Sequence, residues 1–282
     1  MKASNAIILT AIFFLCQCKK DSEQSYSNES IVLDHAQAAL YFHTIFREAE
    51  NVWAFVDSMK YQEGSYPQAA NPSMGSKLFI CHGNDKSKNI DIQYDAWLTQ
   101  HFRLTGTIRL EVDTFSYRKN AKEARVRLND FSINGQAVAG ESVIKYRKMA
   151  NKTNDSYTFT LLEGTVIYEA GVSMPVLISG IINNGQYERI EGSETWVQED
   201  DVWAFSGVMT GMMHENPNLK FTNTVNSTYT VNNETKDGRV YYSMKCNFGD
   251  NGLSHIKIPK RSDIIFGYGC SELYFETVTP VN

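Results

Sequence analysis

The sequence feature that most constrains the fold is the stretch Arg125–Arg147, which has the pattern of a β-hairpin. Asn134-Gly135 separates two runs of alternating apolar and polar residues, and this dipeptide is the strongest short-range signal of a two-residue hairpin turn. Both central residues of a type I′ turn need positive φ, which asparagine tolerates and glycine adopts freely. The sequence therefore predicts two antiparallel strands joined at this turn.

The outgoing strand of this hairpin changes phase before the turn. Val126 and Leu128 occupy even positions, whereas Phe131 and Ile133 occupy odd ones. Because side chains alternate between the two faces of a strand, a regular strand would send these two pairs to opposite sides of the sheet. One extra residue at Asn129-Asp130, a β-bulge, returns all four to the apolar face of the hairpin. We therefore expect a bulge at this dipeptide.

Similar alternating runs follow one another through most of the chain. Short polar segments separate them, including Asn183-Asn184-Gly185, which predicts another hairpin turn, and Glu199-Asp200-Asp201, which predicts a solvated one. No long helical pattern lies between the runs, which disfavours a parallel sheet with its long crossover connections. The pattern predicts a mainly β fold, a long twisted antiparallel meander that forms a half-barrel or a sandwich to bury its apolar face. After a loop at Tyr66–Ser76, the predicted strands are Lys77–Cys81, Asn89–Tyr94, a run through Ile108–Val112, the hairpin strands, Tyr157–Tyr168, Val172–Ile182, Gln186–Val197, Val202–Met212, Leu219–Val231, Arg239–Phe248, Ser254–Ile258, Asp263–Phe266 and Glu272–Thr277.

One segment, Ile31–Tyr61, has the period of an α-helix, with apolar residues at three- and four-residue spacing. Asp34 is expected to cap it, and Glu63-Gly64 with Pro67 to end it. Charged residues fall mostly outside the apolar stripe, which predicts one N-terminal amphipathic helix packed on the sheet. Those residues are Arg47, Glu48, Glu50, Asp57 and Lys60.

The first residues have the pattern of an export signal. Ala6–Leu15 is an apolar run too short to span a bilayer, and Leu15 precedes Cys18 with the spacing of a bacterial lipobox. We expect residues 1–17 to be a lipoprotein signal peptide, Cys18 to carry the lipid, and residues 18–30 to be a tether before a single domain at 31–282. Cleavage before Cys16 and a plain secretory signal are the alternatives.

Composition and motifs argue against several classes of function. The net charge is −5 without a long run of either sign, so neither a nucleic-acid footprint nor a polybasic membrane patch is present. The six histidines include no His-Glu-x-x-His motif, and His35 and His43 are expected to be surface or capped residues that bind no metal. The sequence predicts no cofactor, metal site or catalytic residue. Four aromatic residues, Trp196, Trp203, Tyr241 and Tyr242, form either a sugar-stacking platform or part of the sheet core.

The cysteines that remain after the predicted lipid attachment are Cys81, Cys246 and Cys270. An envelope location permits disulfides. The chain runs out and back between Cys246 and Cys270, so we predict a bridge between them, which would add roughly 3 kcal/mol in the chain-entropy description. Cys81 would remain a buried thiol. The alternative is that all three are reduced core residues.

Three segments together form a distinctive set: Asn129–Gly135 followed by Gly140, Trp196–Gly211, and Ile264–Cys270 with its Phe-Gly-x-Gly-Cys sequence. As a set they resemble motifs of uncharacterised Bacteroidetes cell-envelope lipoproteins, from roughly Phe102 to the C-terminus. Ile265 and Tyr268 stand where that pattern has acidic residues, so this chain lacks those two carboxylates. The resemblance implies a cell-envelope lipoprotein, and it assigns no catalytic residue.

The expected function is therefore that of a membrane-anchored envelope lipoprotein, held in the outer membrane through Cys18, with a non-enzymatic binding or structural role. Its ligand would be a glycan, a lipid or another protein, and nucleic acid is not expected. The alternative is a hydrolase or lyase that acts on polysaccharides at the cell envelope, because carboxylates on a sheet need no local motif to perform that chemistry.

Overall fold

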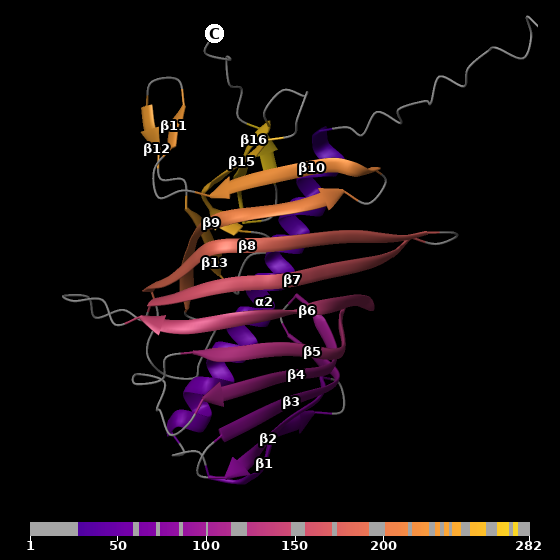
Figure 1. Ribbon diagram of the computed structural model, residues 1–282, viewed down its shortest axis with the longest axis vertical. Helices are drawn as coiled ribbons and strands as arrows, with labels where there is room; N and C mark the ends of the chain where they lie inside the picture. The colour runs from indigo at the N-terminus through magenta and orange to yellow at the C-terminus, as the bar shows by residue number, and fades with distance from the viewer. Residues whose placement is uncertain are drawn as a thin grey trace, which may run out of the picture.

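The computed structural model shows a long helix and an extensive antiparallel sheet (Figure 1). The structure describes residues 28–58, 62–71, 74–84, 87–99, 101–113, 123–147, 156–170, 174–191, 201–213, 216–225, 229–231, 234–236, 239–243, 249–257, 264–270 and 273–275. The predicted signal peptide, Cys18 and most of the tether lie outside these ranges.

The elements follow the chain in a simple order. They are α2 (Asn28–Ser58), β1 (Gly64–Asn71), β2 (Gly75–Asn84), β3 (Ser87–Leu98), β4 (Arg103–Asp113), β5 (Ala124–Ile133), β6 (Gln136–Arg147), β7 (Ser156–Ala170), β8 (Met174–Glu191), β9 (Val202–Met213), β10 (Asn216–Val225), β11 (Tyr229–Val231), β12 (Glu234–Lys236), β13 (Val240–Ser243), β14 (Gly249–Asn251), β15 (Leu253–Lys257), β16 (Ile264–Tyr268) and β17 (Leu273–Phe275).

The main sheet has fifteen strands, and its order follows the sequence from β1 to β10 before it continues through β15, β16 and β17. The sheet forks at β9: residues Gly207–Met213 pair with β10, whereas Val202–Phe205 pair with β13. β11 and β12 form a separate two-stranded sheet. Neighbouring strands are antiparallel, so the predicted mainly β meander is confirmed.

The helix α2 runs along the long axis of the molecule, behind the strands in the view of Figure 1. From His35 to Glu50 its described side chains are buried, except that of Gln37, which is half-buried. A helix lying on a flat sheet would bury only one face. The sheet therefore curls around α2, which fills the inside of a half-barrel.

The ends of the helix differ from the prediction. It begins at Asn28, so Asp34 lies within the helix and is not its N-terminal cap. The last described helical residue is Ser58. Helical periodicity locates the body of a helix better than its ends, because a polar residue can serve as a cap or occupy a turn.

The hairpin at Asn134-Gly135 is confirmed. The two residues have φ values of 54° and 79°, as a type I′ turn requires. The predicted bulge is also present, because the register between β5 and β6 shifts between Arg127 and Ser132 and Asp130 has a φ of 47°. The backbone of the bulge packs directly against Gly106 of β4, where an added Cβ would lie 2.1 Å from the Asp130 carbonyl oxygen. This position therefore needs a glycine on the neighbouring strand.

Two other local predictions were wrong. Asn183-Asn184-Gly185 is not a hairpin turn but lies inside the long strand β8, where the pairing with β9 shifts register between Asn183 and Gln186. Glycine and asparagine are common at bulges as well as at turns, so the local signal does not distinguish the two. The expected loop Tyr66–Ser76 contains most of β1, which pairs with β2 at one end of the sheet order and tolerates Pro67 there.

Candidate functional site

Charged side chains of α2 meet partners from the inner face of the sheet. We call this group the buried charged cluster. Three of its residues lie on the helix, one lies on β2, one lies on β8, and one lies just before β9. All are at most 7% exposed. The members are Arg47, Glu48, Glu50, Lys77, Arg189 and Asp201, and their formal charges, three positive and three negative, cancel.

Glu48 forms one half of the cluster. Its Oε2 atom lies 2.5 Å from Lys77 Nζ and accepts a hydrogen bond of 2.7 Å from the Tyr94 hydroxyl group. Burial alone would raise the pKa of Glu48, but the charge and hydrogen bond of Lys77, the hydrogen bond of Tyr94 and the charge of Arg47 together hold it below its ordinary value. Burial and the neighbouring Glu48 carboxylate raise the pKa of Tyr94 well above its ordinary value. At neutral pH this half is an ion pair with a neutral tyrosine donor.

Glu50 and Asp201 form the other half. The Tyr157 hydroxyl group donates a hydrogen bond of 2.7 Å to Glu50 Oε1, and Arg189 Nη2 lies 3.6 Å from the same oxygen. Arg189 Nε lies 3.7 Å from Asp201 Oδ1. Burial lowers the pKa of Arg47, while Asp201, Glu48 and Glu50 act in the opposite direction. The Glu199-Asp200-Asp201 prediction is therefore wrong for Asp201, which is buried beside an arginine.

This cluster can orient the helix but is poorly placed for catalysis. Two carboxylates that act on a polymer must reach it, whereas these carboxylates are almost fully enclosed and each lies beside a cation. Removing one partner of a buried pair is strongly destabilising, whereas the whole pair adds little net stability. We therefore interpret the cluster as a device that fixes the rotation of α2 inside the sheet.

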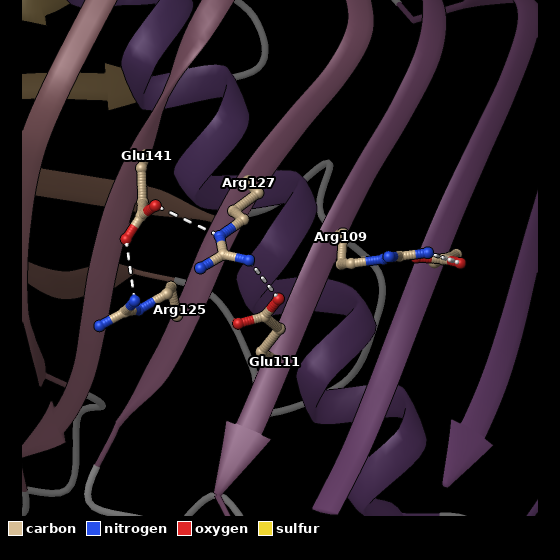
Figure 2. Close-up of polar contacts among 6 residues, drawn as sticks. Arg109, Glu111, Arg125, Arg127 and Glu141 are labelled. Atoms are coloured by element: carbon tan, nitrogen blue, oxygen red, sulfur yellow. Dashed lines mark hydrogen bonds and ion pairs between the residues drawn. The ribbon is translucent and has the colours of Figure 1, made fainter.

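A second charged network lies on the outer face of the sheet, on the side away from α2 (Figure 2). This outer charged face consists of Asp91, Arg109, Glu111, Arg125, Arg127 and Glu141, from β3 to β6. Figure 2 shows the five labelled side chains in front of the strands, with α2 behind them. Except for Asp91, these side chains are 30% to 46% exposed, so a partner in solution can reach them.

Each arginine of the outer charged face binds at least one carboxylate. Arg109 donates from Nε and Nη2 to the two oxygens of Asp91, at 2.6 and 2.8 Å, and these bonds lower the pKa of Asp91. Arg127 lies between two glutamates, 2.8 Å from Glu111 and 3.2 Å from Glu141. Arg109 and Arg127 are direct neighbours on adjacent strands, yet they turn to different carboxylates, which avoids repulsion (Figure 2).

Arg125 completes the network through Glu141, at 3.2 Å. The formal charges of the outer charged face also cancel, with three positive and three negative groups. A surface of this kind exerts little long-range attraction on a polyanion or a polycation. It offers ordered donors and acceptors at short range.

The predicted cysteine sites are only partly described. Cys270 takes part in a disulfide, whereas Cys81 is a free, buried cysteine whose thiol pKa is raised by burial. Cys18 and Cys246 lie outside the described residues. The Cys246–Cys270 pairing and the lipid at Cys18 therefore stay predictions.

The aromatic residues that were candidates for a sugar-stacking platform belong mostly to the core. Trp203 and Tyr242 are 1% and 2% exposed, and Tyr241 is half-buried. Trp196 lies outside the described residues. The expectation that His35 and His43 are surface or capped residues was also wrong, because both are buried on α2. The sequence pattern placed them on a helix but did not show that almost every described side chain from His35 to Glu50 is buried.

Sequence reasoning missed the partners in both networks. The outward positions of Arg109 and Glu111 were visible in the alternation of β4, but which residues of β3, β5 and β6 lie beside them depends on the register. Lys77, Tyr157 and Arg189 carried no signal, because an isolated polar residue at an inward position is not distinctive. The only signal in the sequence is a charged residue at a strand position where the alternation predicts an apolar one.

Within the part of the chain that the structure describes, no group of three or more His, Cys, Asp or Glu side chains is arranged to hold a metal ion. The helix of that part is not apolar enough to cross a membrane. Comparisons of the chain with protein-family models, with curated proteins and with solved structures found no match.

Proposed function

We propose that the chain is a lipid-anchored cell-envelope protein with a non-enzymatic role, in which it binds a partner through the outer charged face. The N-terminal apolar run and the spacing of Leu15 and Cys18 support the anchor. The observation that carries the binding role is the position of α2. Because the helix fills the concave side of the sheet, a partner would bind the outer side, where β3 to β6 present ordered and exposed charged side chains.

The charge of the outer face narrows the class of partner. A polyanionic glycan or an anionic lipid surface is attracted by an excess of positive charge, which this face lacks. A face with alternating donors and acceptors at fixed positions is complementary to a surface that carries both positive and negative charges, as the surfaces of most proteins do. We therefore favour another envelope protein over a charged glycan or a lipid.

The alternative, a polysaccharide hydrolase or lyase, has less support. A general acid needs a carboxyl group whose pKa is raised, and Arg109 lowers the pKa of Asp91. In the buried charged cluster, the pKa of Glu48 is also lowered, and the group is enclosed. The two accessible carboxylates of the outer charged face, Glu111 and Glu141, are both ion-paired with Arg127, whereas glycoside chemistry needs one carboxyl group that donates a proton.

Cell fractionation tests the anchor. The full-length chain is expressed in a bacterium that processes lipoproteins, and membrane and soluble fractions are compared for the wild type, Cys18→Ala and Cys16→Ala. We expect Cys18→Ala to leave the membrane fraction and Cys16→Ala, the matched control, to remain there. A Cys18→Ala protein that stays wholly with membranes would overturn the anchor.

A polysaccharide panel tests the absence of an enzymatic role. The purified full-length protein is incubated with each polymer, and new reducing ends or unsaturated products are measured. We expect no turnover above that of a heat-treated sample. Turnover that is lost in Asp91→Asn or Glu48→Gln, with the fold intact by circular dichroism, would replace the binding proposal with the enzymatic one.

A further inference from the structure

His43 occupies an unusual position for an ionisable side chain. It lies on α2, is 3% exposed, and is stacked on the ring of Tyr242 from β13, with ring centroids 4.0 Å apart and planes at 17°. The Tyr187 ring of β8 lies 5.3 Å away and the Phe46 ring of the helix 6.4 Å away. The imidazole therefore forms part of the contact between the helix and the C-terminal strands.

Neither ring nitrogen of His43 has a hydrogen-bond partner among the described residues. Both nitrogens are fully buried, and a protonated imidazole would place two N–H donors and a positive charge there. Such a group is stable in an interior only when it is paired.

The groups around His43 do not compensate a positive charge. Arg47 lies one turn further along the same helix and repels it. Tyr187 and Tyr242 stay neutral, because burial raises the pKa of each phenol well above its ordinary value. Tyr268 of β16, which contributes to the raised pKa of Tyr242, is likewise held neutral by burial. Burial, with the charge of Arg47, accordingly lowers the pKa of His43 well below its ordinary value.

The cover over the imidazole is a short element. β13 has only four residues, Val240–Ser243, and it pairs with Val202–Phe205 of β9 on one edge and with the three-residue strand β14 on the other. Withdrawal of β13 would uncover His43 without breaking the pairing of β2 to β8. On the far side of the cluster, Glu48 and Lys77 tie the helix to β2 independently.

We propose that His43 is a proton-operated latch that holds β13 on α2 while the imidazole is neutral and releases β13 in mildly acidic solution. In the closed state the ring serves as an aromatic packing surface for Tyr242. In the open state the ring reaches water and takes up a proton, which stabilises that state. The latch is independent of the proposed anchor and partner.

The size of the effect follows from proton linkage. An imidazole that is neutral when closed and has the ordinary pKa of 6.5 when open increases the opening equilibrium constant by a factor of 1 + 10^(6.5 − pH). This factor is about 1.1 at pH 7.5 and about 30 at pH 5. Opening of β13 should thus increase close to 30-fold between the two values.

Hydrogen exchange measured by mass spectrometry tests the latch. Purified full-length protein in mild detergent is labelled at pH 7.5 and pH 5, and the rates are corrected for the intrinsic pH dependence of exchange. We expect protection of Val240–Ser243 and of the paired residues Val202–Phe205 to fall by about 30-fold at pH 5. Global unfolding exposes both His43 and His35, so protection of β3, β4 and β5 should also fall at pH 5, but β13 should exchange faster than these strands at both pH values because it opens locally.

Two variants assign the response to His43. His43→Phe keeps an aromatic ring of similar shape that cannot be protonated, and it should abolish the acid response. His35→Phe, two turns earlier on the helix, should retain the response, and this comparison holds even where His43→Phe fails to fold. No change in β13 at pH 5, exchange of β13 that is no faster than that of β3 to β5, or a response that persists in His43→Phe or is lost in His35→Phe would overturn the proposal.

Discussion

The buried pair of Glu48 and Lys77 offers the sharpest test of how α2 is held. The perturbation is Lys77→Met, which keeps a long apolar side chain and removes the charge. The Lys77 ammonium lies over the rings of Phe79 and Tyr94, at 5.3 and 5.6 Å, so the methionine side chain has apolar surface to pack on. The change therefore isolates the loss of the ion pair from the loss of packing.

The expected magnitude follows from what remains around the carboxylate. Removing one partner of a buried ion pair costs about 3–5 kcal/mol, because the other charge is left uncompensated. Glu48 keeps the hydrogen bond of Tyr94 at 2.7 Å and the nearby charge of Arg47. We therefore expect a loss at the low end, about 3 kcal/mol in the free energy of unfolding at pH 7.

The double variant Glu48→Gln/Lys77→Met should be destabilised by much less than the sum of the single variants. Both charges are then gone, and the glutamine still offers Tyr94 an acceptor. A coupling free energy of about 2 kcal/mol is expected for such neighbours. The matched control is Lys145→Met, which breaks a 2.9 Å pair with Glu123 whose side chains are 52% and 44% exposed, and should cost less than about 1 kcal/mol.

The pH dependence has a definite sign. In the wild type the pKa of Glu48 is lowered below 4.5, so the stability that the pair contributes is present above pH 4.5 and is lost as the pH falls through the folded-state pKa. Without Lys77, burial dominates and the pKa of Glu48 should rise. Protonation of Glu48 then stabilises the variant. The difference in free energy of unfolding between the variant and the wild type should therefore become smaller at acidic pH.

Urea unfolding of the full-length protein in mild detergent, followed by circular dichroism and tryptophan fluorescence, provides these free energies by linear extrapolation. A loss below 1 kcal/mol for Lys77→Met, or strictly additive single variants, would refute the reasoning. A difference in free energy of unfolding between the variant and the wild type that increases as the pH falls from 6 to 4 would also refute it.

Three further predictions concern other parts of the fold. Gly164→Ala should reduce the free energy of unfolding by about 1–3 kcal/mol in the same urea assay, because the added Cβ would lie 2.6 Å from the Phe42 ring of the helix; an unchanged midpoint would contradict this close contact. Arg127→Met should cost only about 0.2–1 kcal/mol, and less in high salt, because its ion pairs are partly exposed; a salt-independent loss would argue against an electrostatic cause. Peptide mapping without reductant should recover Cys270 linked to Cys246, and a linkage to any other cysteine would refute the predicted bridge.

The sequence alone was sufficient for features that neighbouring residues decide. The turn at Asn134-Gly135 requires positive φ at two adjacent positions, and few other dipeptides permit this. The bulge at Asp130 followed from a phase slip in one strand, since side-chain direction alternates with every residue. The antiparallel class followed from strand runs joined without helices. These are short-range properties, so they can be predicted without knowledge of the rest of the chain.

The candidate sites depended on contacts that no local pattern contains. Arg47, Glu48 and Glu50 were expected outside the apolar stripe of the helix, and they are buried because the sheet curls around it. Glu48 meets residues 29 and 46 positions away, and Glu50 meets Tyr157 at a separation of 107. The outer charged face likewise required the register of four strands. The same local signal at Asn183-Asn184-Gly185 became an irregularity inside β8 because pairing with β9 continues past it.

The sequence by itself therefore determined the β class, the hairpin and the presence of the helix, because backbone preferences and side-chain alternation act over a few residues. Only the tertiary structure decided that the helix is enclosed, that His43 lies under β13, and that two balanced charge networks occupy opposite faces of the sheet. Curvature of a sheet is a collective property of many strands. The burial of any one side chain inside it cannot be inferred from that side chain's neighbours in the chain.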